Sequence, residues 1–418
     1  MRSETETPLA PDQPGAPAAV SIDGVEAASV VAPETPEAVA ETLAGAAERG
    51  LAVAPVGGGT ALGLGNPPER VDIALSTARL AGVIAYEPTD LVLSVGAGAR
   101  FGDVQAVLAE HGQELPLDPP LGDRATIGGL IATALAGPRR LSSGSLRDYL
   151  IGISVAHPSG TVTKAGGMVV KNVSGFDLAR VYHGSLGTLG AIVSANFKVL
   201  PAPRAETTIL VEAASPDEAL DLAELVRGGR IQPAALEVSL TDDRWRVAVR
   251  LLGRSETVAA LATEVEGTIR QGSTRLDGEE SRGWWREYVD ELEVAHAPRE
   301  VLVRCAARPK ASHQLVRDAL AATADRGLRV RRVAASVGLG TVTVRAANDD
   351  EGGEWLAGWR NDLLRIADHV TVLAAPPDWK RGIDVWGPEP EGLDIMRALK
   401  EQFDPHRVLN PGRFAAGI

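Results

Sequence analysis

The stretch best suited to chemistry is PVGGGTALGLGNPP (residues 55–68), in which five glycines fall between positions 57 and 65. Because glycine has no Cβ, such a loop can bring several backbone N–H groups against phosphate oxygens. A nucleotide-hydrolysing P-loop needs a lysine after its second glycine, and residues 57–65 contain none. The spacing also fails the G-x-G-x-x-G pattern of a Rossmann site. Tight turns therefore explain this loop as well as a phosphate ligand does.

Two more glycine clusters follow in the same half of the chain. One is DPPLGDRATIGGLIATALAG (residues 118–137), and the other is KNVSGFDLARVYHGSLGTLGAI (residues 171–192). Three separate glycine loops within one mixed α/β region are easier to explain by a single long ligand than by three unrelated turns. The sequence therefore favours an extended, phosphate-bearing ligand held largely by main chain.

Metal-ligating and redox-active side chains are sparse. No two of the seven histidines have the short spacing of a typical metal site, which predicts that the chain holds no metal. Cys305 is the only cysteine, so the chain cannot form an internal disulfide. This cysteine usage favours a cytoplasmic location.

The elements around the first loop form a β-α-β pattern. A strand over residues 27–33 precedes a helix in which Thr35 is the cap, Pro36 takes the first position and Gly50 is the stop signal. The strand at 51–56 then runs directly into the glycine loop. Further strands are predicted at 71–76, 82–88, 91–98, 149–158 and 192–200, with a helix at 101–112.

The pattern changes after Pro201-Ala202-Pro203. From there to about residue 376 glycine loops are few, and strand and helix patterns interleave. This order is typical of an α+β domain with an antiparallel sheet. Residues 391–414 then predict a helix followed by a turn.

Composition limits the partners. With 418 residues and 44% hydrophobic content, the chain can bury the cores of two or three domains. Its net charge of −13 argues against binding nucleic acid or an anionic membrane. The sequence contains no run of about 18 apolar residues, which a membrane-spanning helix would need. We therefore expect no direct membrane insertion. Any membrane contact would come through a partner.

Taken in order, several motifs resemble a known family. PVGGGTALGLG, ATIGG, GSLRDYLIGISVAHPSGTV, KNVSGFDLARVYHGSLGTLGAIV and FDPHRVLNPGRF are similar to those of FAD-linked oxidases of the vanillyl-alcohol oxidase/p-cresol methylhydroxylase (PCMH) type. The resemblance implies an α+β fold in which FAD lies extended between two α/β subdomains beneath an α+β cap. The implied division is a disordered tail (1–22), a PCMH-type FAD-binding domain (23–203), a cap or substrate domain (204–378), and a C-terminal segment that returns to the FAD-binding domain (379–418).

The resemblance also implies where FAD lies. Gly57 to Thr60 would cradle the pyrophosphate, Gly144 would lie near the flavin half, and Ile192 would meet the adenine through its backbone. The full set of implied cofactor-binding residues is Val56, Gly57, Gly58, Gly59, Thr60, Ala61, Pro119, Ala125, Thr126, Gly128, Gly129, Thr133, Gly144 and Ile192. Residues 55–68 lack the histidine that bonds covalently to flavin in some relatives, so we expect non-covalent, dissociable FAD.

Within this family the cap motifs favour one subgroup. WWREYVDEL (284–292) and VLVRCAARP (301–309) are similar to the FAD-binding E subunit of bacterial glycolate oxidase. ASVGLGTVTVR (335–345) lacks the histidine and carboxylate of the metal motif found in D-2-hydroxy-acid dehydrogenases. The implied function is that of an FAD-binding subunit that oxidises a small 2-hydroxy acid by hydride transfer to flavin or relays its electrons. The implied partners are a second flavoprotein subunit and an iron–sulfur subunit.

The sequence leaves the catalytic residues and two other functions open. Arg304 is a candidate catalytic residue that would bind a substrate carboxylate, and Lys171 is a candidate catalytic residue near the flavin. A solvated strand charge and a surface lysine are the more common explanations for such residues. The alternatives for the whole chain are a stand-alone FAD-dependent oxidase of a sugar or alditol, and a non-catalytic FAD-binding scaffold or relay.

Overall fold

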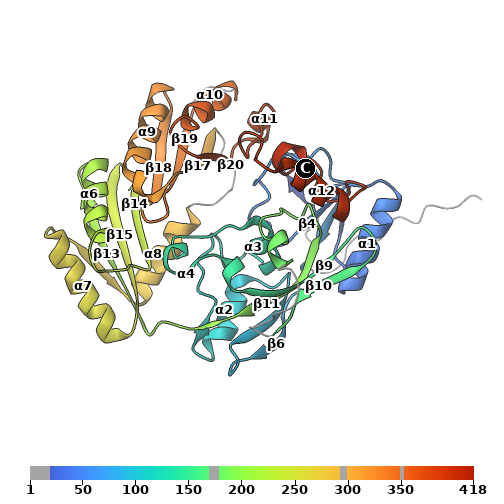
Figure 1. Cartoon of the computed structure of the whole chain (residues 1–418), viewed down its shortest axis with the longest axis horizontal. Coiled ribbons are helices and arrows are strands. Elements are labelled where there is room, and N and C mark those ends of the chain that lie inside the picture. The colour runs from blue at the N-terminus through green and yellow to red at the C-terminus, as the bar shows by residue number, and fades with distance from the viewer. Residues whose placement is uncertain (1–18, 169–177, 292–298, 349–352) are drawn as a thin grey trace, which may run out of the picture.

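The computed structural model describes residues 19–168, 178–291, 299–348 and 353–418. The candidate Lys171 and the first part of the third glycine cluster lie outside these ranges. The described glycine-loop region contains a three-stranded and a five-stranded sheet with two two-stranded ones, and a larger eight-stranded sheet stands beside them (Figure 1). The expected α+β class is confirmed.

The first subdomain is built on a three-stranded parallel sheet with the order β3-β5-β4. The Thr35 side chain accepts a hydrogen bond from Ala38 N at 3.1 Å, and Pro36 opens the helix, as predicted. Val39 and Leu43 of that helix are buried in the core of this subdomain. The elements are β1 (Ser21–Ile22), β2 (Val25–Glu26), β3 (Ser29–Val31), α1 (Pro36–Glu48), β4 (Val53–Val56) and β5 (Ile73–Ser76).

The second subdomain has a five-stranded antiparallel sheet with the order β10-β9-β11-β7-β6. Leu93, Ile127, Ile153 and Phe197 are among its buried core residues. The strands are β6 (Val83–Glu87), β7 (Val92–Gly96), β8 (Gln113–Glu114), β9 (Leu150–Ala156), β10 (Val162–Gly166), β11 (Ala191–Lys198) and β12 (Leu200–Pro201). The helices are α2 (Phe101–Ala109), α3 (Ile127–Thr133), α4 (Arg140–Ser143), η1 (Leu146–Asp148) and α5 (Ala179–Tyr182).

The cap is an eight-stranded antiparallel sheet with the order β16-β13-β15-β14-β18-β19-β17-β20. Its strands are β13 (Ala205–Ala213), β14 (Ala235–Thr241), β15 (Arg244–Gly253), β16 (Thr274–Asp277), β17 (Glu300–Ala306), β18 (Arg329–Ser336), β19 (Thr341–Ala347) and β20 (His369–Ala374). The helices that follow the glycine-loop region are α6 (Pro216–Arg227), α7 (Ser255–Ile269), α8 (Glu279–Asp290), η2 (Pro309–Ala311), α9 (Ser312–Asp325), α10 (Glu354–Leu363), α11 (Pro377–Lys380), α12 (Leu393–Phe403) and η3 (Ala415–Gly417).

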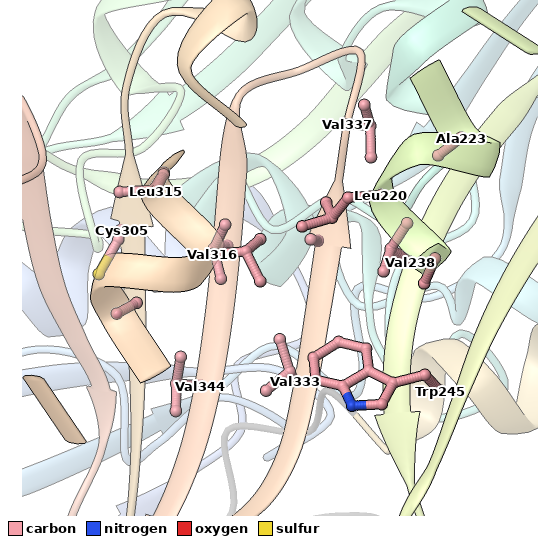
Figure 2. Close-up of a cluster of buried hydrophobic side chains, with 14 of the residues drawn as sticks. Leu220, Ala223, Val238, Trp245, Cys305, Leu315, Val316, Val333, Val337 and Val344 are labelled. Atoms are coloured by element: carbon pink, nitrogen blue, oxygen red, sulfur yellow. The ribbon is translucent and has the colours of Figure 1, made fainter. Parts of the chain in front are cut away.

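The two faces of the cap sheet have opposite character, because side chains alternate along a strand. One face is apolar and is covered by helices. There, Leu220 of α6 and Val316 of α9 pack on Val238 and Val333 (Figure 2). Cys305 is buried in the same cluster, and burial raises the pKa of its thiol to about 12, so it stays an unreactive thiol.

The opposite face, called the polar face below, combines charged side chains with a small apolar cluster under α8. The adjacent strands β13, β15, β14 and β18 contribute the buried Glu206, Arg250, Glu237 and Arg332. Strand β17 contributes the half-buried Arg304. Helix α8 covers part of this face, and the second subdomain approaches the rest (Figure 1). A sheet that turns charged, largely buried side chains toward a neighbouring domain is suited to forming one wall of a polar site between them.

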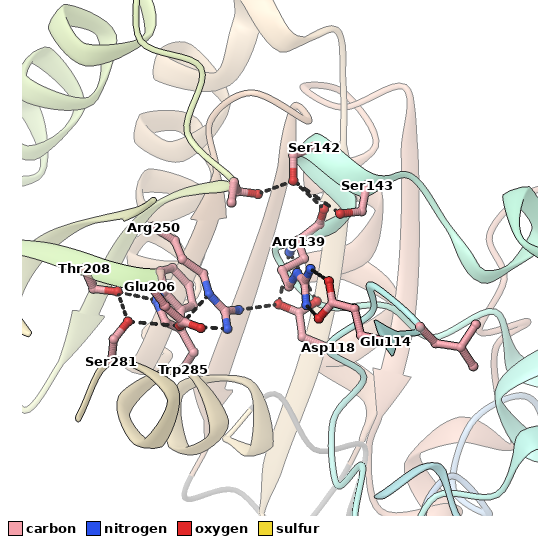
Figure 3. Close-up of polar contacts among 12 residues, drawn as sticks. Glu114, Asp118, Arg139, Ser142, Ser143, Glu206, Thr208, Arg250, Ser281 and Trp285 are labelled. Carbon is pink, nitrogen blue, oxygen red and sulfur yellow. Dashed lines mark hydrogen bonds and ion pairs between the residues drawn. The ribbon is translucent and has the colours of Figure 1, made fainter. Parts of the chain in front are cut away.

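Arg250 links the cap to the second subdomain (Figure 3). Its guanidinium lies 2.9 Å from Glu206 within the cap and 3.2 Å from Asp118 of the second subdomain. Beside it, Arg139 pairs with Glu114 at 2.6 Å, and the Ser142 hydroxyl donates to Ala234 O at 3.0 Å. Burial outweighs the two arginines and raises the pKa of Asp118 to about 6. These contacts fix the polar face of the cap against the glycine-loop region.

Glu237 gives the cap a testable pH dependence. It is buried, accepts a hydrogen bond from the Tyr288 hydroxyl at 2.9 Å, and has a pKa raised by burial to about 7. Between pH 4.5 and pH 7 the folded chain therefore holds a proton that the unfolded chain has lost, so stability falls as the pH rises through this window. We expect this residue to lower the stability of the cap by about 3 kcal/mol between pH 4.5 and pH 8.

The isosteric variant Glu237→Gln tests this expectation, because it keeps an oxygen that can accept from Tyr288. Urea unfolding followed by tryptophan fluorescence at pH 5 and pH 8 should show a smaller pH difference in the variant than in the unmodified protein. Identical pH differences would show that Glu237 does not titrate in this range.

Candidate functional site

The first two glycine loops face each other across a cleft between the two subdomains. One wall is the loop after β4, from Val56 to Leu62, and the other is the start of α3 with Thr126, Gly128 and Gly129. Gly190 and Ile192, at the end of the third glycine loop, also line the cleft. The cleft is open to solvent at its mouth, and backbone and side chains from all three glycine loops meet along it.

Most of the residues that the sequence indicated for the cofactor come together here. Those that line the cleft are Val56, Gly57, Gly58, Gly59, Thr60, Ala61, Thr126, Gly128, Gly129, Thr133 and Ile192. Three lie outside this lining. Ala125 is buried behind the second loop, Pro119 lines a neighbouring cavity between α2 and α8, and Gly144 ends α4 with a φ of +76°.

Glycine is required where the two walls approach each other. A Cβ on Gly58 would lie 1.9 Å from the carbonyl oxygen of Arg124, and a Cβ on Gly57 would lie 2.0 Å from Thr126 Oγ1. Gly59 has a φ of +72°, a conformation that L side chains rarely adopt. These glycines therefore set how closely the loops approach.

The first loop also carries open hydrogen-bond donors. Within the described part of the chain, the backbone N–H groups of Gly57, Gly58 and Gly59 donate to no protein acceptor. Successive free N–H groups in a glycine loop form a nest that binds phosphate oxygens. The residues present therefore fit the diphosphate of FAD without a lysine in the loop.

The C-terminal segment, which the sequence predicted to return to the FAD-binding domain, braces these loops through side chains that the sequence did not indicate. Lys380 Nζ pairs with Asp23 at 2.8 Å and donates to Gly63 O at 2.5 Å. Asn410 Nδ2 donates to Leu186 O at 2.6 Å, and Lys400 Nζ donates to Thr188 O at 2.9 Å. The first and third loops are thus fixed by a segment that lies more than 200 residues away in sequence. The FDPHRVLNPGRF motif was the only signal for it.

Arg304 lies on the polar face of the cap, on β17. Two residues before it on the same face, Leu302 packs in one cluster with the cleft residues Leu135 and Leu186. Arg304 is half-buried, and its pKa is lowered by burial and then by the nearby positive charge of Arg140. Among the described residues it forms no ion pair. Arg304 thus lies near Arg140 and two residues along β17 from Leu302, but it does not itself line the cleft.

Among the described residues, no cluster of three or more histidine, cysteine, aspartate or glutamate side chains is arranged to hold a metal ion. No helix within the described ranges combines the length and apolar character needed to cross a membrane.

Comparison with known proteins points to the FAD-linked oxidases. Residues 27–166 match the FAD binding domain, and residues 388–414 match the C-terminal domain of FAD linked oxidases. Over these two regions the chain resembles the FAD-linked oxidases. Both matches fall on the parts that form the cleft and its brace, and the family resemblance and the FAD cofactor predicted from the sequence are confirmed.

Curated proteins similar to this chain include two subunits of glycolate oxidase. Glycolate oxidase subunit GlcE of Escherichia coli K12 is 35% identical over 210 residues, which cover 49% of this chain and 55% of that relative. The matched region thus spans about half the length of GlcE. Glycolate oxidase subunit GlcD of Bacillus subtilis is 25% identical over 425 residues, covering 93% of this chain and 89% of the relative.

A third curated relative and a solved structure extend these comparisons. D-lactate dehydrogenase of Archaeoglobus fulgidus is 25% identical over 426 residues, covering 92% of this chain and 90% of the relative. Among solved structures, alkyldihydroxyacetonephosphate synthase superposes with a TM-score of 0.69 at 18% identity, covering 93% of this chain and 78% of that one. This likeness shows a shared fold. The class predicted from the sequence, an FAD-dependent oxidoreductase, is confirmed.

Proposed function

We propose that this chain binds one FAD non-covalently and is the FAD-binding subunit of an oxidase complex for glycolate or a related 2-hydroxy acid. The similarity to two proteins named as glycolate oxidase subunits supports this proposal. The observation that carries the substrate class is Arg304, a half-buried cation on the strand whose Leu302 packs against cleft residues, which has no anionic partner among the described residues.

The chemistry required of the chain follows from the substrate. A small 2-hydroxy acid must be oriented by its carboxylate, and a buried guanidinium binds a carboxylate through two parallel hydrogen bonds. Arg304 would hold that carboxylate from the cap side, and Arg140 adds positive charge nearby. Bound FAD would supply the acceptor for the hydride from the α-hydroxy carbon. The packing of Leu302 against Leu135 and Leu186 would keep water from this region.

Reduction of the flavin by substrate tests the function directly. The purified holoprotein should lose its yellow colour under anaerobic conditions when glycolate or a related 2-hydroxy acid is added. Bleaching by a sugar or alditol but not by these acids would establish a stand-alone alcohol oxidase instead. Full flavin occupancy with no bleaching by any of them would establish a scaffold or relay subunit.

Arg304→Met should weaken substrate binding without emptying the cofactor site. Loss of a hydrogen bond to a charged group predicts a fall of about 10- to 100-fold in kcat/KM, mainly through KM. Arg244→Met is the control, because Arg244 is an exposed arginine of the same sheet that pairs only with Glu212 among the described residues. Stopped-flow flavin reduction gives both constants. An unchanged KM in Arg304→Met would remove this residue from the substrate site.

Non-covalent attachment predicts that denaturation releases the flavin. Residues 55–68 offer no histidine to the flavin, and Cys305 is buried in the cap core. Precipitation with trichloroacetic acid should leave all flavin absorbance in the supernatant. Colour or fluorescence that stays with the precipitated polypeptide would contradict this expectation.

The proposed partners are a second flavoprotein subunit and an iron–sulfur subunit, to which electrons would pass. We also propose a cytoplasmic location, with any contact to a membrane made through these partners. Affinity purification of the tagged full chain from its own cells should bring down both proteins in fixed ratios. A fully active solitary chain would contradict the complex.

A further inference from the structure

A buried arginine at the C-terminal end of the chain lies against the first glycine loop. Arg413 is only 4% exposed and lines the cleft. Its Nη2 donates to the carbonyl oxygens of Leu62 and Leu64, at 2.8 and 2.5 Å. One side of the guanidinium is therefore fixed to the loop whose N–H groups at Gly57 to Gly59 are open.

The other side of this guanidinium has no protein partner. Arg413 Nη1 is buried and makes no hydrogen bond to any described residue. A buried donor without an acceptor is uncommon in native proteins, because its lost hydration is not replaced. In a residue that lines a cofactor cleft, the missing acceptor points to the ligand.

The buried charges near Arg413 also favour an anionic ligand. The nearby carboxylate, Asp23, binds the ammonium of Lys380 with both oxygens, at 3.1 and 2.8 Å. Two buried cations, Lys380 and Arg413, thus share one carboxylate. Burial lowers the pKa of Arg413 to about 10, which leaves it protonated near neutral pH.

We propose that Arg413 is an FAD-binding residue whose Nη1 donates a charge-assisted hydrogen bond to a negatively polarised oxygen of the cofactor. The oxygen belongs either to the diphosphate or to the pyrimidine end of the flavin ring. Both accept such a bond, and riboflavin, which lacks the diphosphate, distinguishes them. The inference rests on the dissociable FAD proposed above.

Equilibrium titration of the apoprotein tests this role through affinity alone. Arg413→Met should weaken FAD binding by about 10- to 100-fold, as for other hydrogen bonds to charged groups. Arg413→Lys, which keeps the charge, should weaken it less. Arg407→Met is the matched control, because Arg407 is in the same turn but exposed and pairs with Glu69 at 3.6 Å; it should bind FAD like the unmodified chain.

Two further measurements complete the test. If riboflavin binding is unaffected by Arg413→Met, the bond goes to the diphosphate; if it weakens in parallel and the flavin midpoint potential falls, the bond goes to the ring. Should the methionine variant not fold, Arg413→Gln retains a donor for the loop carbonyls without the charge. Folded Arg413→Gln with unchanged FAD affinity would overturn the inference. Failure of the unmodified chain to bind FAD would instead overturn the cofactor assignment.

Discussion

Gly58→Ala should purify without flavin and unfold at a lower temperature than the unmodified protein. The new Cβ would lie 1.9 Å from the carbonyl oxygen of Arg124 and 2.9 Å from its carbon, both backbone atoms that cannot rotate away. The two cleft walls must therefore separate, which costs about 1–3 kcal/mol and displaces the open N–H groups. We expect FAD affinity to fall by about 100-fold, as a loss of roughly 3 kcal/mol implies.

The ratio of absorbance at 450 nm to that at 280 nm, together with a thermal melt, measures both effects. Gly45→Ala is the control, because Gly45 lies inside α1 and a Cβ there meets nothing within 4 Å. That change should keep full flavin content and raise stability by about 0.5–1 kcal/mol. Normal flavin content in Gly58→Ala would refute the close approach of the two loops.

Lys380→Met should cost about 3–5 kcal/mol of stability, the range for breaking a buried ion pair. Both Lys380 and Asp23 are fully buried, so the variant leaves the Asp23 carboxylate without its ammonium. It also removes the donor that holds Gly63 O and Gly65 O. The glycine loop should loosen as well, and FAD should dissociate faster.

The neighbouring Arg381 provides the matched control. It pairs with Asp378 at 3.3 Å, but both side chains are exposed. Surface ion pairs contribute about 0–1 kcal/mol, so Arg381→Met should be close to neutral. Chemical denaturation of the three proteins gives the comparison. Equal stabilities of Lys380→Met and Arg381→Met would show that the buried pair does not brace the loop.

Local signals explain what could be predicted from the sequence. The Thr35-Pro36 start of α1 depends only on adjacent residues, so it was predictable from them. The glycine loops were recognisable because a close approach of two main-chain segments requires glycine, and the sequence shows this as clusters of glycines. Neither the glycine spacing nor the family resemblance showed that Gly57 contacts Thr126; the resemblance implied only that both residues bind the cofactor.

Elements that depend on distant contacts were missed. Strand β18 (Arg329–Ser336) begins with three arginines in its first four residues, which hides its alternation. Its Arg332 is accommodated because its guanidinium donates to Tyr288 O at 2.8 Å, on a helix 44 positions earlier. Arg413 and Lys380 were missed for the same reason, because their partners on the first glycine loop lie more than 300 positions away.

Calorimetric titration of the apoprotein with FAD tests the central claim most directly. If open main chain from the glycine loops, together with Arg413, holds the cofactor, the titration should show one FAD per chain, with inorganic pyrophosphate competing for the site. A folded chain that releases or absorbs no heat with FAD, and gains no thermal stability from it, would contradict the whole account.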